Sequence, residues 1–315
     1  MNILIALDSS PTAQAALEAA LARHWPPATE FRVLTVLPQK REWTSDSVHD
    51  AYILVDDAAS KIEARNPDSI GTALFGEGDA AKCILKHARE WPADLIIVGS
   101  HDRGPLERLF MGSVSRAVFQ DADCSVLVAR RIDESSEVNR VLVPIDESFN
   151  AQIAVDKLLS SRWPENTYFK LVSAAVVDQR MFGRQAKDMA HVDVIEQRED
   201  YLYGINETLQ RTKAKLDVHF GREYVDCVVR EGEPAQVILD IAKEWDAHLI
   251  VIGSSERPGV TLKMFGSLAQ TVALKAPCSV QAVRWVAAPL RSGIPNAQRS
   301  LKQVLSAPVS RRKKI

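Results

Sequence analysis

The chain has 315 residues, of which 46% are hydrophobic and 25% charged, and a formal net charge of −2, as expected of a globular protein with room for two cores. The near-neutral charge argues against a nucleic-acid surface over the whole molecule, and no window approaches twenty uninterrupted apolar residues, so we expect no membrane span. A strand is predicted from Ile3, which leaves no room for a signal peptide, and the four cysteines form no C-x-x-C pair. Together these features predict a cytoplasmic protein.

Short apolar runs alternate with helical segments along the first half. The run from Ile3 to Leu7 is typical of a strand buried on both faces, and Ser10-Pro11 is a helix-start signal because proline suits the first helical position. The predicted strands are 3–7, 31–37, 70–75, 95–98 and 125–129, and the predicted helices are 13–22, 47–64, 79–90 and 114–120. This alternation predicts an α/β fold, a parallel sheet with helices on both faces.

The second half repeats the first. The segment Asp-Leu-Ile-Ile-Val-Gly-Ser at 94–100 returns as His-Leu-Ile-Val-Ile-Gly-Ser at 248–254, and a Gly-Ser pair follows each copy, at 112–113 and 266–267. The offset between the copies rises from 138 to 154 residues, so about sixteen extra residues are expected within the polar stretch 178–200. A period this long predicts two domains rather than a solenoid.

The end of the chain has no counterpart in the first half. Residues 287–315 contain seven Lys or Arg and no acidic residue, together with three Pro and one Gly. This composition predicts a basic, disordered tail. The run Arg311–Lys314 leaves open a second interpretation, electrostatic binding to an acidic partner, a lipid surface or nucleic acid.

A candidate site lies where the first and fourth strands end. In open α/β sheets ligands bind beyond the carboxyl ends of the strands, and Asp8 and Gly99 follow those two strands. Gly112 and Ser113 would present backbone N–H groups at a helix start, where the helix dipole favours an anion, and the hydroxyls of Ser113 and Ser115 could bind phosphate oxygens. The alternative is that Asp8 and Ser113 only cap helices and the glycines only make turns.

These features resemble the universal stress protein family. The similarity rests on the openings Ile-Ala-Leu-Asp-Ser-Ser and Val-Pro-Ile-Asp-Glu-Ser, the strand ending in Val-Gly-Ser, the helix start Gly-Ser-Val-Ser and the closing Cys-Ser-Val-Leu-Val. It implies two Rossmann-like (adenine nucleotide alpha hydrolase-like) domains, 1–132 and 139–286, each with a five-stranded parallel sheet of order 3-2-1-4-5. It also implies that the two domains pair through their last strands as an intramolecular pseudo-dimer.

The resemblance also implies a pocket in each domain. The first pocket would be lined by Ala6, Asp8, Val36, Val98, Gly99, Gly112, Ser113, Val114 and Ser115, and the second by Pro144, Asp146, Ile252, Gly253, Gly266 and Ser267. The ATP-binding branch of the family carries G-x2-G-x9-G-[ST], but Asp102 and Glu256 stand where the second glycine belongs. An acid about 4 Å from a phosphate oxygen costs roughly 4 kcal/mol at an effective dielectric of 20. Each acid precedes an arginine, and Arg103 turned inward would reverse the sign of this effect.

We therefore expect a stress-response regulatory protein that binds ATP or a related adenine nucleotide, with or without Mg²⁺, most readily in the first domain. The alternative is a nucleotide-free interaction protein that acts through an unknown protein partner. The seven histidines show no metal-ligand spacing, and no Walker loop or G-x-S-x-G elbow is present, so we expect neither a metal site nor an enzyme. Slow ATP hydrolysis is left open by the sequence.

Overall fold

The structure is a computed structural model that describes residues 1–37, 45–100, 111–130, 138–177, 191–254 and 266–284. All described residues belong to one compact unit, which spans residues 1–285. The predicted basic tail at 287–315 lies outside the described residues. All strands and helices named below belong to this compact unit.

Strands and helices alternate in the first domain as predicted. They are β1 (Asn2–Ala6), α1 (Pro11–Leu21), β2 (Glu30–Leu37), α2 (Ser45–Arg65), β3 (Ile70–Glu77), α3 (Ala80–Glu90), β4 (Leu95–Gly99), α4 (Ser113–Asp121) and β5 (Ser125–Ala129). The helix-start signal at Ser10 is confirmed, because its side chain accepts a hydrogen bond from the backbone N–H of Ala13 and caps α1.

The second domain repeats this order. It comprises β6 (Asn139–Pro144), α5 (Phe149–Ser160), β7 (Thr167–Ala175), α7 (His191–Phe220), the short 3-10 helix η1 (Arg222–Tyr224), β8 (Val225–Glu231), α8 (Pro234–Glu244), β9 (Leu249–Gly253), α9 (Ser267–Lys275) and β10 (Ser279–Val283). The capping serine recurs as well, since the side chain of Ser148 accepts from the N–H of Ala151 at the start of α5. The two halves are thus built on one local pattern.

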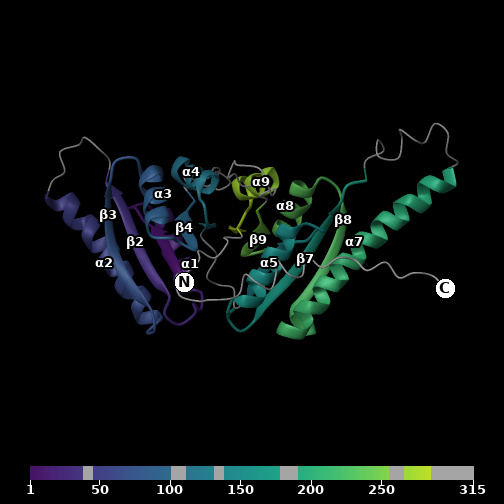
Figure 1. The fold of residues 1–315 in the computed structure, drawn as a ribbon, viewed down its shortest axis with the longest axis horizontal. Helices are drawn as coiled ribbons and strands as arrows, with labels where there is room; N and C mark the ends of the chain where they lie inside the picture. Colours follow the sequence, from purple (N-terminus) through teal and green to yellow (C-terminus); the bar gives the residue numbers. More distant parts are fainter. Residues whose placement is uncertain (38–44, 101–110, 131–137, 178–190, 255–265, 285–315) are drawn as a thin grey trace, which may run out of the picture. The chain divides into compact units, whose positions relative to one another are not determined.

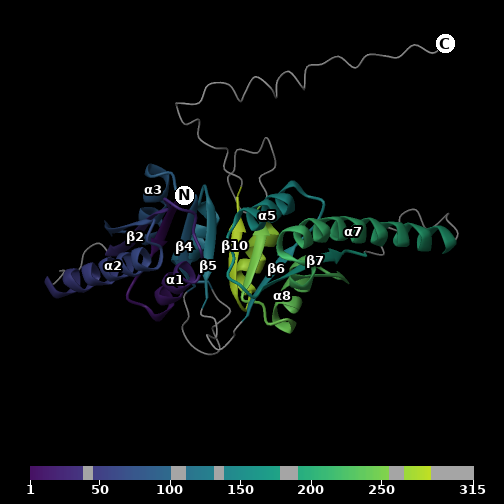
Figure 2. The same ribbon diagram turned by 90° about the horizontal axis from the view of Figure 1, so that it is seen from below.

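All ten named strands belong to one sheet. The order is β3-β2-β1-β4-β5-β10-β9-β6-β7-β8, so each domain has the predicted order 3-2-1-4-5 with parallel strands. The last strands, β5 and β10, pair antiparallel, with Leu127 opposite Gln281, and they lie side by side in Figure 2. This is the edge-to-edge pairing that the family resemblance implied.

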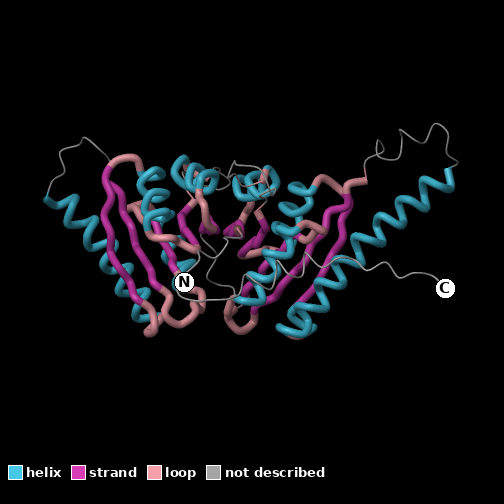
Figure 3. The backbone as a smooth tube through the Cα atoms, in the orientation of Figure 1, coloured by secondary structure: helices cyan, strands magenta, loops and turns pink. Residues whose placement is uncertain are grey.

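Helices cover both faces of this sheet and form two apolar layers that run through both domains. On one face α3, α4, α8 and α9 pack against strand residues such as Leu4 and Val126, and these helices lie along the upper side of Figure 1. On the other face α1, α2, α5 and α7 pack against residues such as Ile3 and Leu127. Successive strand residues point to opposite faces, so strands covered on both sides are apolar throughout. Figure 3 shows the helices flanking the strands.

The second domain differs from the first mainly in one helix. Helix α7 has 30 residues, whereas its counterpart α2 has 21. The stretch 178–200, where the extra residues were expected, therefore includes the first turns of a long helix, and its residues 178–190 lie outside the described part. Neither α7 nor any other described helix is long and apolar enough to cross a membrane.

Candidate functional site

A cavity of about 560 Å³ opens at the carboxyl ends of β1 and β4. All nine residues predicted for the first pocket from the described part of the chain line it, namely Ala6, Asp8, Val36, Val98, Gly99, Gly112, Ser113, Val114 and Ser115. Seven further residues line the cavity and were not predicted from the sequence: Leu7, Ser10, Ala13, Leu34, Ala80, Ile84 and Met111. Arg103 and Asp102 lie outside the described residues.

Most of the cavity wall is apolar. Leu34 and Val36 on β2, Val98 on β4 and Ile84 on α3 contribute aliphatic side chains, and Met111 closes the wall before α4. The contribution of α3 could have been anticipated, because this helix begins directly after β3 at the same edge of the sheet. An apolar wall of this kind favours a flat, weakly polar group of a ligand over a charged group.

The polar end of the cavity is the start of α4. Gly112 occupies the N-cap position with φ −62° and ψ 162°, and no side chain in the described part of the chain caps the helix. The first N–H groups of a helix have no intrahelical acceptor, and the helix dipole makes this end partly positive. The arrangement can bind an anion such as a phosphate group.

Ser115 has a different partner from the predicted phosphate. Its hydroxyl donates a hydrogen bond of 2.5 Å to the carbonyl oxygen of Gly99, and the residue is buried. A hydroxyl has one donor hydrogen, so this bond uses it and ties the first turn of α4 to the end of β4. Ser113, the other serine predicted to bind phosphate, is exposed and lines the cavity.

Asp8 holds the start of α1 without capping it. Its Oδ1 accepts hydrogen bonds from the backbone N–H of Ser10, at 3.0 Å, and from the Ser10 hydroxyl. Asp146 makes the same two bonds to Ser148 in the second domain. The alternative that Asp8 and Ser113 are the caps is therefore wrong, because Ser10 caps α1 and Gly112 occupies the N-cap of α4.

The second domain has a smaller cavity of about 190 Å³ at the equivalent place. Four of the six predicted residues line it (Pro144, Asp146, Ile252 and Gly253), whereas Gly266 and Ser267 do not. Glu256, the counterpart of Asp102, lies outside the described residues. The structure therefore does not bring all of the predicted second set together at one cavity.

Three residues that line the second cavity are larger than their counterparts in the first. Proline at 144 and at 234 replaces the alanines of the first domain, and Leu268 lines the cavity and packs on the core. Its counterpart Val114 is 37% exposed. Val172 and Ala174 are smaller than the matching residues of β2 and only partly offset these changes.

Gly253 is required by packing within the second domain. A Cβ atom at this position would lie 2.0 Å from the carbonyl oxygen of Asn150, at the start of α5. A side chain at position 253 would therefore collide with the protein's own backbone.

Two doubly wound α/β domains that share one sheet, each with a cavity beyond its first and fourth strands, define a tandem protein of the Rossmann-like class. The sequence model of the universal stress protein family matches residues 1–130 and 137–284. The chain therefore belongs to the universal stress protein family and contains two copies of its domain.

Individual relatives agree with this assignment. A universal stress protein of Mycolicibacterium smegmatis is 26% identical over 307 residues, which cover 90% of this chain and 97% of the relative. Universal stress protein YxiE of Bacillus subtilis is 27% identical over 145 residues, 41% of this chain and 98% of the relative. The crystal structure of a universal stress protein from Archaeoglobus fulgidus aligns with a TM-score of 0.62 at 20% identity, over 90% of this chain and 98% of that one, and this similarity concerns the fold alone.

The Ser115 hydrogen bond predicts a stability difference between two neighbouring serines. Ser115→Ala removes a buried donor and leaves the Gly99 carbonyl without it, so the free energy of unfolding should fall by about 1–2 kcal/mol. Ser113→Ala, at an exposed position two residues away, should change it by less than about 0.5 kcal/mol. Urea unfolding followed by circular dichroism measures both, and equal effects would contradict the assigned role of Ser115.

The packing of Gly253 predicts that two Gly→Ala substitutions have opposite signs. Gly253→Ala forces a methyl group into the Asn150 backbone and should destabilise the protein by about 2–3 kcal/mol. Gly204→Ala, within α7 and with nothing inside 4 Å of the new methyl, should stabilise it by about 0.5–1 kcal/mol. Thermal unfolding of both variants is the measurement. A Gly253→Ala variant as stable as the wild type would show that α5 does not approach β9 in this way.

Proposed function

We propose that the cavity of the first domain binds ATP or a related adenine nucleotide, and that the protein is a cytoplasmic stress-response regulator whose nucleotide occupancy biases a partner-binding surface. The observation that carries the proposal is one cavity that combines a largely apolar wall with a helix start that no described side chain caps. An adenine nucleotide has the same division, with a flat base at one end and phosphates at the other.

The size and chemistry of the cavity support this proposal. Small-molecule sites typically span about 300–1,000 Å³, and the first cavity, at about 560 Å³, falls inside that range. The second, at about 190 Å³, falls below it. The nucleotide phosphates would lie at the N–H groups that follow Gly112, with the base against the aliphatic wall. Arg103, which lies outside the described residues, would supply a cation for the phosphates.

Binding rather than catalysis is the role that the cavity supports. Asp8 is the one titratable side chain among its described lining residues, and its Oδ1 already accepts two hydrogen bonds. A hydrolytic enzyme needs a positioned base or nucleophile with a partner that activates it. Hydrolysis in this cavity would therefore be slow, and Mg²⁺ would arrive with the nucleotide, since the described residues contain no cluster of three or more His, Cys, Asp or Glu that could hold a metal ion.

A second candidate function is that of a nucleotide-free interaction protein acting through an unknown partner. The small second cavity favours it for the second domain. The replacement of the motif glycine by Asp102 and by Glu256 favours it for both domains. The two candidates differ in one observable, the binding of nucleotide to the purified protein.

The proposal predicts that one of two matched glycine substitutions abolishes binding. Gly112→Val places a branched side chain at the helix start of the first cavity and should weaken ATP binding more than about a hundredfold, equivalent to ~2.7 kcal/mol. Gly266→Val makes the same change at the start of α9 and should leave binding unchanged. Both glycines have ordinary negative φ values, −62° and −58°, so neither substitution strains the backbone.

Isothermal titration calorimetry with ATP and Mg²⁺ measures affinity and stoichiometry in the two variants and the wild type. We expect one site per chain in the wild type and in Gly266→Val. Wild-type affinity in Gly112→Val would overturn the assignment of the first cavity, and loss of binding in Gly266→Val would place the site in the second domain.

A further inference from the structure

Two buried arginines lie at the joint between the domains, which is the antiparallel pair of strands β5 and β10. The side chain of each arginine reaches into the opposite domain. Arg130 follows β5 and Arg284 follows β10, and they are only 6% and 5% exposed. Each is the counterpart of the other in the repeat, 154 positions apart. The antiparallel pairing of β5 with β10 brings the end of each strand next to the other domain.

Each arginine binds the carboxyl end of a helix in the opposite domain. Arg284 donates from Nη1 to the carbonyl oxygen of Ala122, the C-cap residue of α4, at 2.7 Å. Arg130 donates to the carbonyl oxygens of Ala273 in α9 and Cys278 just before β10, at 2.6 and 3.0 Å. A cation is favourable at a helix C-terminus because the last carbonyl groups lack intrahelical donors and the dipole is negative there.

The backbone reinforces both contacts. The N–H of Arg284 donates to the hydroxyl of Ser125 at 3.1 Å, and the N–H of Arg130 donates to the hydroxyl of Ser279 at 3.0 Å. Burial lowers the pKa of Arg130 to about 10, so the guanidinium stays protonated at neutral pH. Both side chains are thus built into the protein interior.

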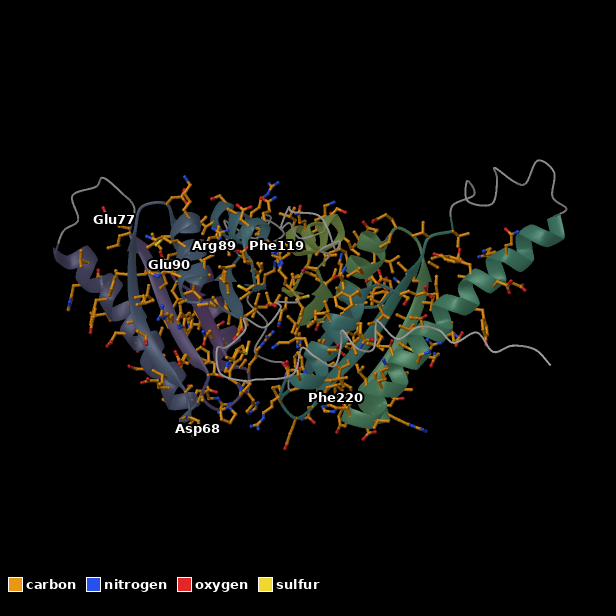
Figure 4. All side chains as sticks on the ribbon, viewed as in Figure 1. Asp68, Glu77, Arg89, Glu90, Phe119 and Phe220 are labelled. Carbon is orange, nitrogen blue, oxygen red and sulfur yellow. The ribbon has the colours of Figure 1, made fainter. Side chains whose placement is uncertain are left out.

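Helix α4 connects this joint directly to the first cavity. Its first turn lines the cavity and is tied to β4 by Ser115, and its last turn ends at Ala122, where Arg284 binds. The helix has nine residues, and between its ends lies the buried Phe119, labelled in Figure 4. A helix this short moves as one body, so a contact at its C-terminus constrains the N–H groups at its N-terminus.

We propose that Arg284 of the second domain is a positioning residue for the nucleotide pocket of the first domain. The proposal rests on the proposed nucleotide function for its ligand, but the link from Arg284 to α4 exists without one. Arg284 holds α4 at the angle at which its N-terminus meets a phosphate group. By linkage, nucleotide bound at α4 stabilises the contact between the domains to the same extent.

The repeat supplies a matched control for this proposal. Arg284→Met and Arg130→Met each remove one buried guanidinium from the same joint, but the first frees α4 and the second frees α9. Both variants should lose similar stability. Only Arg284→Met should weaken ATP binding, by about tenfold, with Arg130→Met staying within about twofold of the wild type. Arg284→Lys keeps the cation and should restore much of the affinity if the methionine variant folds poorly.

Calorimetric titration with ATP and Mg²⁺ gives the affinities, and hydrogen–deuterium exchange of the nucleotide-free proteins gives a readout that needs no ligand. Exchange should rise in α4 for Arg284→Met and in α9 for Arg130→Met. Equal losses of affinity in the two methionine variants, or unchanged exchange in α4, would overturn the proposal. A wild-type protein that binds no nucleotide would instead refute the proposed function, while exchange in α4 would still decide whether Arg284 holds the helix.

Discussion

The antiparallel pairing of β5 with β10 is the contact on which both halves of the molecule depend. Every residue of these two strands is buried. A single domain would leave one of them as an apolar edge with unpaired backbone groups, which favours aggregation. Joining the two edges makes one sheet of the ten named strands and lets each apolar layer continue from one domain into the other. Helices α4 and α9, which begin beside the two cavities, end at this joint.

The two domains share the same backbone arrangement, but they differ in the side chains that line their cavities. The Asp-x-Ser arrangement before α1 and α5 and the glycine N-caps of α4 and α9 recur in both. The side chains that differ are those that fill the cavity, above all Leu268 in place of Val114. The second domain also lacks the hydroxyl of Ser115, since Ala269 stands there. In the proposed function, the first domain binds the ligand and the second domain contributes through its contact with the first.

Much of the fold could be predicted because its signals are local. Apolar runs mark the strands, Ser10 before a proline marks a helix start, and the repeat let each half test the other. The first turns of α7 were not predicted because they lie in a polar stretch. Without apolar residues at helical spacing, such a stretch is interpreted as an inserted loop rather than as a helix that packs on the sheet. The partners of Ser115 and Arg284 were also missed, since hydrogen bonds to distant backbone atoms depend on tertiary geometry. The family resemblance supplied nine of the sixteen described lining residues of the first cavity, and the lining from Ala80 and Ile84 could have been anticipated because α3 begins directly after β3.

Quantifying the nucleotide that leaves the freshly purified protein on denaturation tests the central claim most directly. Chromatography of the supernatant identifies the compound and gives its amount per chain. One adenine nucleotide per chain is the predicted result, because in the described part of the chain one cavity has the necessary volume together with a helix start that lacks a side-chain cap. If no nucleotide is released and none binds when ATP and Mg²⁺ are added, the first cavity is not a nucleotide site.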